Sequence, residues 1–293
     1  MTNTCRVNHR PTPRVSRHQY ILLIVLLLFA QGGITHAEAD KGETAKFLTY
    51  NVLADPVHKE MRLAALFKIL GESDADLIAL QEVAPWFLDE LKKEAWLKNY
   101  HYPQSEGEPF APRGLFILSR SPVTKITAEY LPSRQQRAYL IVETKVKGVK
   151  VSVATCHLDS FLDQGELRAR QLGIIYGKLK DAESAVFLGD FNFGDMEEPE
   201  TSKLDKGYTD AWEETKGDDA GFTWNIEASK MALEGSFPNE PSRRLDRILL
   251  RSERFKAIGA EVLGDKALDE DGNVFPSDHF GLGATVRVGA KEG

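Results

Sequence analysis

Four short apolar runs in this chain each end in a polar residue that can bind a ligand, and this pattern constrains the fold more than any other feature. The four end residues are Asn51, Glu82, His157 and Asp190. Each run has the length of a buried strand, and strands laid side by side bring their ends to one rim. Asp246 and the pair Asp278-His279 flank the last two apolar runs. The sequence therefore predicts β-rich layers with a polar cleft at one rim, where sites form on such scaffolds.

The run that precedes Asp190 is the most informative of the four. It is apolar up to Gly189, and then Asp190 and Asn192 follow two residues apart. Residues with this spacing in an extended segment point the same way, so both side chains can address one small ligand. A simple strand-to-turn junction is the alternative, because Gly, Asp and Asn are common there. The rest of the chain favours a chemical role.

Periodicity and turn signals predict at least three helices outside these strands. The first runs from the Asp55-Pro56 cap to Gly71, the second from Pro85 to about Leu97, and the third starts at the capping-box pair Asp163 and Glu166. The expected strands cover 45–50, 77–80, 115–118, 123–130, 139–144, 149–155, 185–189, 248–250 and 283–288. A long irregular stretch is expected over 194–243 and a loop over 265–278.

The N-terminal segment differs in kind from the rest of the chain. Residues 1–37 hold four arginines and no acid, then an apolar run over 21–30 and small residues before position 38. This order is typical of a secretory signal peptide, so we expect a secreted or periplasmic protein with one domain over 40–293. An uncleaved membrane anchor formed by residues 20–30 is the alternative.

Charge and cysteine content narrow the expected partners. Loss of the four arginines in 1–37 changes the formal net charge from −7 to −11. Every phosphate contact needs a cation, so we expect no extended nucleic-acid-binding face. Cys156 would be the one cysteine left, which fits a small packed side chain rather than cysteine chemistry. A monomer without a stable membrane span is expected.

The polar residues at the strand ends suit oxygen-ligand metals. The chain has no histidine pair or cysteine cluster with zinc spacing, no Walker loop and no nucleophile elbow. Carboxylate and amide oxygens suit Mg²⁺, with Mn²⁺ as the second choice. Water is then the expected nucleophile and a phosphate ester the expected electrophile.

Six short motifs resemble the metal-dependent endonuclease/exonuclease/phosphatase superfamily, which includes deoxyribonuclease I-like enzymes. They are Thr49-Tyr50-Asn51, Leu80-Gln81-Glu82-Val83, Cys156-His157-Leu158, Gly189-Asp190-Phe191-Asn192, Arg244-Leu245-Asp246-Arg247 and Ser277-Asp278-His279. Within the superfamily the chain is most similar to the 5′-tyrosyl-DNA phosphodiesterases, through segments such as His157-Leu158-Asp159-Ser160 and Thr223-Trp224. The resemblance implies an α+β fold, a four-layer α/β/β/α sandwich of two packed mixed sheets with flanking helices.

The resemblance also implies roles for particular residues. The metal ligands would be Glu82, Asn51 and Asp278. The catalytic residues would be Asp190 and Asn192 around the attacking water, His279 and His157 as phosphate donors, and Asp246 behind His279. The substrate-binding candidates are Arg247, Arg137 and Trp224, although the arginines also fit surface charges and Trp224 fits a core position. The implied activity is Mg²⁺-dependent hydrolysis of phosphodiesters, with nucleic-acid ends as the first substrate class.

Three other functions remain open at this stage. A phospholipid or sphingomyelin phosphodiesterase would need an exposed apolar loop, for which Met231, Leu233 and Phe237 are the candidates. A phosphomonoesterase of the same fold is the second. A degenerate binding module is the third, and it is disfavoured because all the principal motif residues are present. An export signal also conflicts with DNA repair inside a cell, so the sequence leaves the substrate open.

Overall fold

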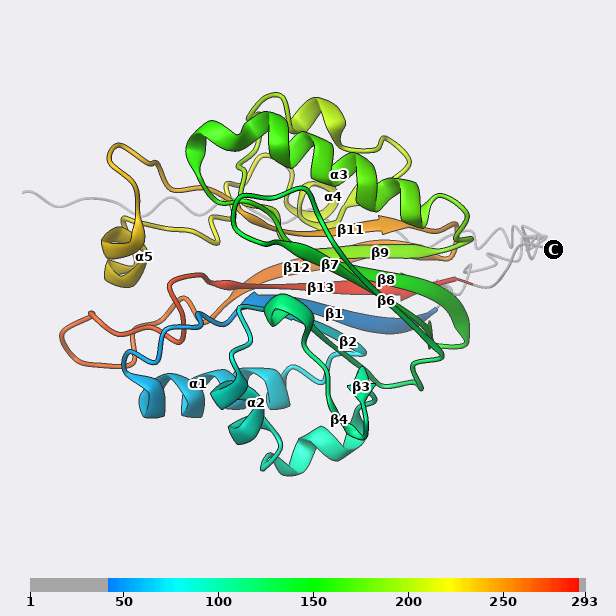
Figure 1. Cartoon of the computed structure of the whole chain (residues 1–293), viewed down its shortest axis with the longest axis horizontal. Helices are drawn as coiled ribbons and strands as arrows, with labels where there is room; N and C mark the ends of the chain where they lie inside the picture. Colours follow the sequence, from blue (N-terminus) through cyan, green and yellow to red (C-terminus); the bar gives the residue numbers. More distant parts are fainter. Residues whose placement is uncertain (1–41, 290–293) are drawn as a thin grey trace, which may run out of the picture. The chain divides into compact units, whose positions relative to one another are not determined.

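Two β-sheets pack face to face in the computed structural model, which describes residues 42–289 (Figure 1). The first sheet has the strand order β12-β13-β1-β2-β5. Its strands are β1 (Glu43–Asn51), β2 (Leu77–Gln81), β5 (Phe116–Ser119), β12 (Phe255–Leu263) and β13 (Gly281–Val288). The second sheet has the order β10-β11-β9-β8-β7-β6. Its strands are β6 (Lys125–Tyr130), β7 (Ala138–Val146), β8 (Val149–His157), β9 (Ala185–Asp190), β10 (Thr209–Asp210) and β11 (Asp246–Arg251). A small hairpin, β3 (Gln104–Ser105) and β4 (Glu108–Pro109), stands apart from both.

Strand register brings the polar strand ends to one rim. β1 and β2 are parallel, and Asn51 lies opposite Gln81, one residue before Glu82. β8 and β9 are also parallel, and His157 lies opposite Asp190. The antiparallel strand β11 begins with Asp246 opposite that same Asp190. Because parallel strands end at the same edge of a sheet, each sheet delivers part of the predicted site.

Apolar side chains from the inner faces of both sheets fill the space between them, among them Phe47, Val153 and Leu188. A polar bridge interrupts this core close to the rim. The Gln81 amide in the first sheet donates to Thr49 Oγ1 at 3.1 Å and to Thr155 Oγ1 in the second sheet at 3.0 Å. All three side chains are fully buried, so the bridge satisfies polar groups that would otherwise be costly.

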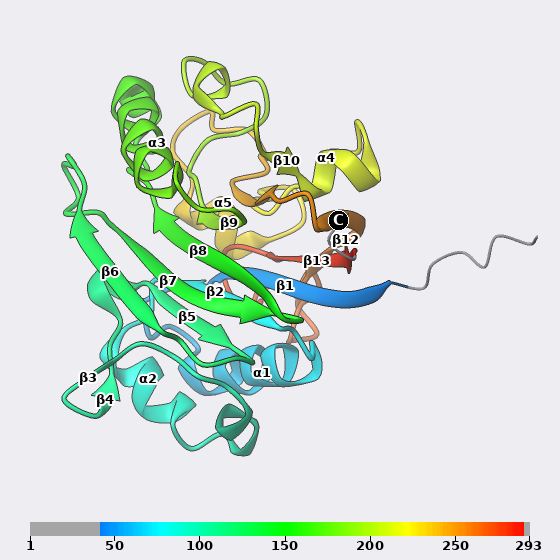
Figure 2. The same cartoon turned by 90° about the vertical axis from the view of Figure 1, so that its right-hand side faces the viewer.

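Helices cover the outer faces of the two sheets (Figures 1 and 2). α1 (Lys59–Glu72) and α2 (Pro85–Leu91) pack on the first sheet through an apolar cluster that includes Leu66 and Phe87. α3 (Gly165–Leu179) packs on the second sheet through Leu172 and Ile175. Two short helices, α4 (Ala211–Lys216) and α5 (Lys230–Gly235), lie in the stretch expected to be irregular. The predicted four-layer α/β/β/α architecture is confirmed.

Helix boundaries differ from the sequence prediction in three places. α1 begins at Lys59, because Asp55 accepts a hydrogen bond from the Val57 backbone within the preceding turn instead of capping the helix. The second predicted helix ends at Leu91 and is followed by a separate 3₁₀ turn, Ala95–Asn99. The predicted capping box is also wrong. Asp163 lies in the 3₁₀ turn Leu162–Gln164, and α3 has no side-chain cap.

Strand β12 was not predicted at all. The register between β12 and β13 shifts between Ala257 and Gly259. A bulge of this kind adds a residue on one strand, so the alternation of apolar and polar residues is lost in the sequence. β12 is also an edge strand, and its burial is therefore incomplete.

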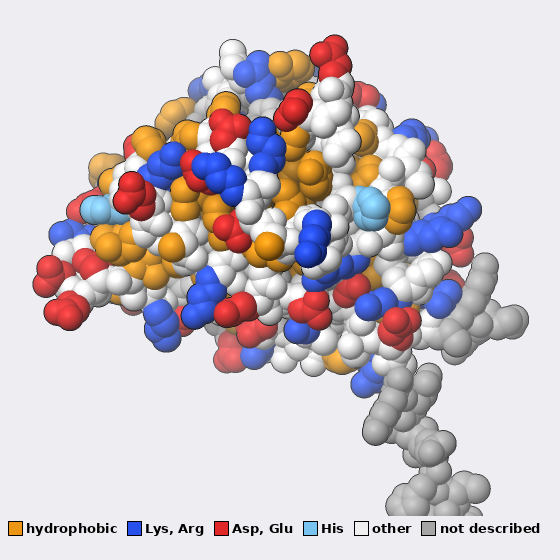
Figure 3. Space-filling view, turned by 90° about the horizontal axis from the view of Figure 1, so that it is seen from below, with side chains coloured by type: hydrophobic (Ala, Val, Ile, Leu, Met, Phe, Trp, Pro, Cys, Tyr) orange, Lys and Arg blue, Asp and Glu red, His pale blue; other side chains and the backbone are white. Residues whose placement is uncertain are grey.

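The described part of the chain contains no helix that is long and apolar enough to span a bilayer. Residues 42–289 belong to one compact unit. The predicted signal peptide, 1–37, and the alternative anchor, 20–30, lie outside the described residues. On the face that α1 and α2 cover, basic and acidic side chains are interspersed (Figure 3), so that face carries no broad basic surface.

The glycine before Asp190 gives a first testable expectation. A Cβ atom on Gly189 would collide with the backbone oxygen of Cys156 on the neighbouring strand. We expect Gly189→Ala to destabilise the protein by about 1–3 kcal/mol, because overpacking forces the strands apart. Urea unfolding followed by circular dichroism measures this. Gly173→Ala is the control, because no atom lies within 4 Å of its Cβ position; equal stability of both variants would contradict the expectation.

Candidate active site

The polar rim of the two sheets encloses a pocket of about 150 Å³. Nine of the eleven predicted site residues line it: Asn51, Glu82, Arg137, His157, Asp190, Asn192, Trp224, Asp278 and His279. Small-molecule pockets usually measure about 300–1,000 Å³. This pocket is therefore large enough for a small anionic group and too small for a nucleoside.

Asp190 lies at the centre of this pocket and is fully buried. Its Oδ2 accepts a hydrogen bond from Asn51 Nδ2 at 3.0 Å and lies 3.4 Å from His157 Nε2 and 3.7 Å from His279 Nε2. Its Oδ1 accepts the backbone N–H of Asn192 at 2.9 Å. Burial raises the pKa of Asp190 to about 7, although nearby His279 opposes this shift. A carboxylate with a pKa near neutrality is suited to accept a proton.

His279 and Asp246 form a buried pair behind the pocket. His279 Nδ1 lies 2.8 Å from Asp246 Oδ2, and Asp246 itself does not line the pocket. Burial lowers the pKa of the His279 imidazole, but the carboxylates of Asp246 and Asp190 outweigh it and raise the pKa to about 10. The imidazole is therefore protonated at neutral pH, and Nε2 presents a donor to the pocket. Trp224 packs against it with ring centroids 5.0 Å apart.

His157 carries no charge in this arrangement. Burial lowers its pKa well below the usual value, and the nearby Arg137 guanidinium adds to the shift. Arg137 Nη1 lies 3.0 Å from His157 Nδ1. A guanidinium can only donate, so Nδ1 accepts and the proton sits on Nε2, which faces Asp190 at 3.4 Å. Arg137 thus fixes the tautomer of His157 as well as lining the pocket.

Glu82 occupies an unusual backbone conformation, with φ of 59°. The left-handed region is uncommon for residues other than glycine and is concentrated at functional sites. Ala54 N–H donates to Glu82 Oε2 at 2.9 Å, and Asn51 Nδ2 lies 3.2 Å from Oε1. Gly114 packs directly on this turn, since a Cβ there would lie 3.3 Å from Glu82 Cα. The surroundings therefore hold the carboxylate toward the pocket.

Asp278 adds a second carboxylate beside Glu82. Ser277 Oγ donates to the backbone oxygen of Asn51 at 2.7 Å and lies 3.1 Å from Asp278 Oδ1. This contact ties the turn before β13 to the end of β1. Burial raises the pKa of Asp278, and the negative charge of Glu82 raises it further. The two carboxylates repel each other across the pocket.

The sequence profile described as the Endonuclease/Exonuclease/phosphatase family matches residues 48–279, which contain all six motifs. The chain belongs to the endonuclease/exonuclease/phosphatase family. This family member is 29% identical to tyrosyl-DNA phosphodiesterase 2 of Mus musculus over 259 residues, covering 85% of this chain and 68% of the relative. It is 28% identical to the Danio rerio protein of the same name over 276 residues, which cover 88% of this chain and 71% of that relative.

A solved structure resembles the fold of this family member closely. It is Danio rerio TDP2 complexed with single strand DNA product, with a TM-score of 0.68 and 26% identity over 83% of this chain and 99% of that chain. The predicted family and its likeness to the tyrosyl-DNA phosphodiesterases are confirmed. Membership of this family, together with the similarity to these relatives, identifies the chain as a metal-dependent phosphoric ester hydrolase, as predicted from the sequence.

The donor set of the pocket fits a divalent cation. Glu82 and Asp278 both line it, and among residues 42–289 neither forms an ion pair with lysine or arginine. Oxygen ligands of this charge suit Mg²⁺ or Mn²⁺. Asn51 Oδ1 accepts the Leu53 N–H at 3.1 Å, and its Nδ2 donates to Glu82 Oε1 and Asp190 Oδ2. In this arrangement Asn51 links Glu82 to Asp190, and its oxygen keeps a second lone pair.

A second group of potential ligands consists of Asp190, Asp246 and His279, whose ligand atoms lie within 4.8 Å of one another. Two observations favour a role in proton transfer over metal binding for this group. Protonated His279 already uses Nδ1 on Asp246, and Asp246 lies outside the pocket lining. An ion held by Glu82 and Asp278 leaves this role intact.

Arg247 does not lie in the pocket, contrary to its predicted role in substrate binding. Its side chain is 1% exposed and its Nη1 lies 2.8 Å from Asp195 Oδ1 and 3.2 Å from Asp210 Oδ2. Arg244 pairs with the same two carboxylates. The side chain of Arg247 points away from the pocket because β11 alternates its faces and Asp246 takes the rim. It stabilises the loop after β9 instead.

Sequence reasoning missed Arg62, which is 1% exposed although it is charged. Its five hydrogen bonds all go to backbone carbonyl oxygens, those of Val52, Leu53, Asp55, Val57 and Pro276. These carbonyls belong to the loops that follow Asn51 and precede Asp278. The sequence does carry a signal for the burial of Arg62, because this arginine lies on the apolar face of α1, one turn before Leu66.

Substitution of Asp246 by asparagine tests the pairing with His279. We expect kcat/KM to fall by about 10–100-fold, the usual effect of losing such a supporting partner. Asp246 raises the pKa of His279, so its loss lowers that pKa. The alkaline loss of activity should then move to lower pH. An unchanged pH profile would contradict the role assigned to Asp246, and Glu214→Gln on exposed α4 is the control.

Proposed function

We propose that this chain is an exported Mg²⁺-dependent phosphodiesterase that hydrolyses a phosphodiester at a nucleic-acid end by in-line attack of water. The observation that carries the proposal is the convergence of Glu82, Asp278, Asp190 and His279 on one pocket of about 150 Å³. A volume of this size accommodates a phosphate group with its ester arms outside. Relatives named for cleavage of tyrosyl-DNA linkages support the substrate class.

The residues divide the reaction between them. Asp190, with a pKa raised to about 7, accepts the proton of the attacking water. Protonated His279 and neutral His157 present N–H donors to the phosphate oxygens as negative charge develops. Asn192 donates its amide to the Leu158 carbonyl at 2.9 Å, which leaves its oxygen to orient the water. When bound between Glu82 and Asp278, Mg²⁺ would neutralise charge on the phosphate.

Activity of the full chain against a panel of substrates tests the proposal. The panel contains a 5′-phosphotyrosyl oligonucleotide, single-stranded DNA, double-stranded DNA, sphingomyelin vesicles and a simple phosphomonoester, each with Mg²⁺, Mn²⁺ or EDTA. We expect turnover of the phosphotyrosyl oligonucleotide that EDTA abolishes. Turnover of the monoester or of sphingomyelin alone would overturn the substrate class while keeping the chemistry.

The three residues considered for membrane contact do not together form an exposed apolar loop. Of the three residues considered for membrane contact, Met231 is buried against Phe275 and Phe280, and Phe237 is half-buried against Phe161 at 5.7 Å between ring centroids. Leu233 is 52% exposed. A single leucine provides little apolar area for a bilayer.

Export rests on residues 1–37 and is proposed from their sequence. Expression of the full chain in a bacterial host, followed by cell fractionation and mass spectrometry of the N-terminus, tests it. We expect a chain that begins near residue 38 outside the cytoplasm. A full-length chain in the membrane fraction would support the anchor instead.

A further inference from the structure

Glu240 is a buried carboxylate in the wall of the catalytic pocket, and the proposed reaction does not use it. Its residue is 5% exposed and lines the pocket of about 150 Å³. The other three carboxylates in the lining already have proposed roles, because Glu82 and Asp278 are placed to hold the ion and Asp190 to accept a proton. None of the six motifs contains Glu240, and it ends no apolar strand. The resemblance to the family therefore assigns it no role.

Three contacts fix the position of the Glu240 side chain. Its Oε2 accepts the Phe237 N–H at 2.8 Å, while the Glu240 N–H donates to the Phe237 carbonyl oxygen at 3.0 Å. These two hydrogen bonds close a short turn, and both residues of the turn line the pocket. The Arg243 guanidinium donates to Glu240 Oε1 through Nη2. The carboxylate is therefore held in one place at the pocket wall.

Arg243 does not cancel the charge that Glu240 brings to the pocket. The guanidinium is buried, lies outside the pocket lining, and also donates through Nη1 to Glu197 Oε2 at 3.2 Å. One positive charge is thus shared by two carboxylates, which leaves a net charge of −1 on the three side chains. Glu197 is partly exposed, so water screens its charge. The buried negative end of the group, Glu240, faces the pocket.

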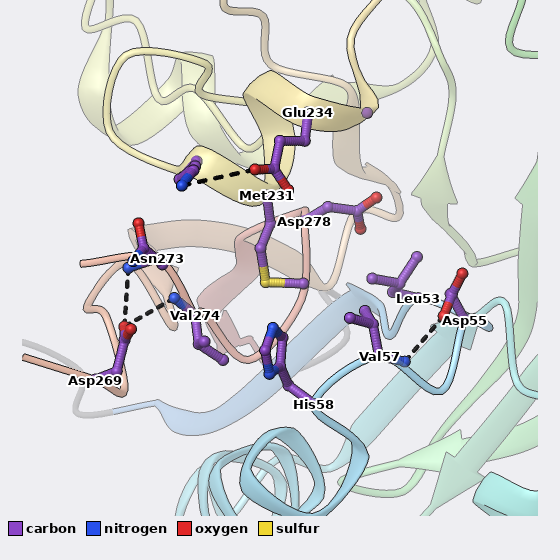
Figure 4. Close-up of a pocket in the computed structure, with 12 residues that line it drawn as sticks. Leu53, Asp55, Val57, His58, Met231, Glu234, Asp269, Asn273, Val274 and Asp278 are labelled. Atoms are coloured by element: carbon purple, nitrogen blue, oxygen red, sulfur yellow. Dashed lines mark hydrogen bonds and ion pairs between the residues drawn. The ribbon is translucent and has the colours of Figure 1, made fainter. Parts of the chain in front are cut away.

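The other acid of the segment 230–240 is Glu234, and it does not line the pocket. It lies in a neighbouring hollow of about 490 Å³ that shares Gly235 with the pocket, and there it is 3.8 Å from Lys230 (Figure 4). Both partners of this pair are exposed, and water screens them. Glu240 is therefore the acid through which this segment acts on a group bound in the pocket.

The charge of a phosphate ester depends on how many arms it carries. A phosphodiester carries one negative charge, whereas a phosphomonoester carries close to two above its second pKa of about 6. Protonated His279 and Arg137 attract both esters. Glu240 repels both, and it repels the doubly charged ester about twice as strongly because Coulomb energy is proportional to charge. The pocket is small, so a phosphate inside it lies close to every side chain of the lining.

We propose that Glu240 is a specificity-determining residue, whose charge at the pocket wall favours phosphodiesters over phosphomonoesters. The proposal rests on the proposed function and adds to it a reason why a diester is the substrate class. Hydrolysis of a diester by water yields an alcohol and a phosphomonoester. The same charge therefore also promotes release of the phosphate product. Like charges placed against each other in a binding site are a common means of excluding a wrong ligand.

The ratio of kcat/KM for two p-nitrophenyl substrates tests the proposal on the full chain. Bis(p-nitrophenyl) phosphate is the diester and p-nitrophenyl phosphate the monoester, and both release the same group. Glu240→Gln keeps the size of the side chain and removes its charge. With Mg²⁺ at about pH 8, where the monoester is doubly charged, we expect the diester-to-monoester ratio to fall about tenfold. The gain in monoester turnover is one that misfolding cannot produce. An unchanged ratio would overturn the proposal.

Two further variants separate the charge of Glu240 from its place in the turn. Glu240→Asp keeps the charge on a shorter side chain and should leave the ratio near that of the wild type, even if both activities fall. Glu214→Gln on exposed α4 removes an equal charge far from the pocket lining and should not alter the ratio. If Glu240→Asp lowers the ratio as far as Glu240→Gln does, the turn sets the preference and the proposal is wrong.

Calorimetric binding of methyl phosphate and dimethyl phosphate gives a reading that does not depend on turnover. These two ligands differ by one arm and one charge. Under the same conditions Glu240→Gln should shift the ratio of their affinities about tenfold toward methyl phosphate. An equal change for both ligands would mean that Glu240 does not discriminate between them.

Hydrolysis of the 5′-phosphotyrosyl oligonucleotide is measured in parallel. Turnover of this oligonucleotide with unchanged ratios in Glu240→Gln overturns the role of Glu240 and keeps the proposed function. A shift in the ratios without turnover of the oligonucleotide keeps the role of Glu240 and overturns the proposed substrate class.

Discussion

Replacement of Glu82 by glutamine is expected to lower kcat/KM for the phosphotyrosyl oligonucleotide by about three orders of magnitude or more. The amide keeps the size of the side chain but removes the negative charge of one of the two carboxylates, Glu82 and Asp278, that are placed to hold the ion. Loss of metal-based charge stabilisation is worth several kcal/mol, and each 1.36 kcal/mol corresponds to about tenfold in rate. Steady-state kinetics over a range of Mg²⁺ concentrations measures the effect.

The same substitution should weaken metal binding itself. Titration of the variant with Mn²⁺, monitored by calorimetry, separates loss of the ion from loss of chemistry. Glu214→Gln on exposed α4 is the matched control and should behave as the wild type. His279→Ala should also abolish turnover, by about 10²–10³-fold, while Mn²⁺ binding remains. Normal activity of Glu82→Gln would mean that the ion lies elsewhere.

Replacement of Arg62 by methionine is expected to destabilise the protein by about 3 kcal/mol or more. The five carbonyl oxygens that accept from this guanidinium would lose a charged donor, and hydrogen bonds to charged groups contribute about 1.5–3 kcal/mol each. Water can hydrate some of the carbonyl oxygens that lose their donor, so the total loss of stability is smaller than the sum over five hydrogen bonds. Urea unfolding of the variant, compared with Arg170→Met on the exposed face of α3, measures it; we expect the control to change stability by less than about 0.5 kcal/mol.

Arg62→Met also separates two ways in which this residue could affect the metal site. Its positive charge lies close enough to Asp278 to interact with it, and loss of charge alone would tighten Mn²⁺ binding. Loss of the contacts to Leu53 and Pro276 would loosen the loops that carry Asn51 and Asp278 and weaken binding. We expect the second effect to be larger. Arg62→Lys, which keeps the charge without the planar fork, should then also bind Mn²⁺ more weakly than the wild type.

Local sequence was sufficient to predict most of the residues that lie at the rim of the two sheets. Asn51, Glu82, His157 and Asp190 each follow an apolar strand, and parallel pairing in register brings such ends together whatever the rest of the chain does. The same reasoning could not place Arg247. Charged side chains are mostly exposed, and the partners that bury Arg247, Asp195 and Asp210, are distant from it in sequence.

Other features depend on contacts that no local pattern records. The bulge between Ala257 and Gly259 removes the alternation that would reveal β12. The start of α1 is set by the loop that Arg62 holds rather than by the Asp55-Pro56 signal. The tautomer of His157 follows from Arg137, which comes from the neighbouring strand region. Each of these features is decided by tertiary contacts that override local preference.

The two sheets contribute complementary halves of the reaction centre. Asn51, Glu82 and the His279 turn come from one sheet, Asp190 and Asp246 from the other, and the Gln81 amide fastens the two together beneath them. Neither half possesses both an ion-binding carboxylate pair and a proton acceptor. A chain whose two sheets are not packed together is consequently incapable of cutting its substrate, so hydrolysis reports directly on the assembled core between them.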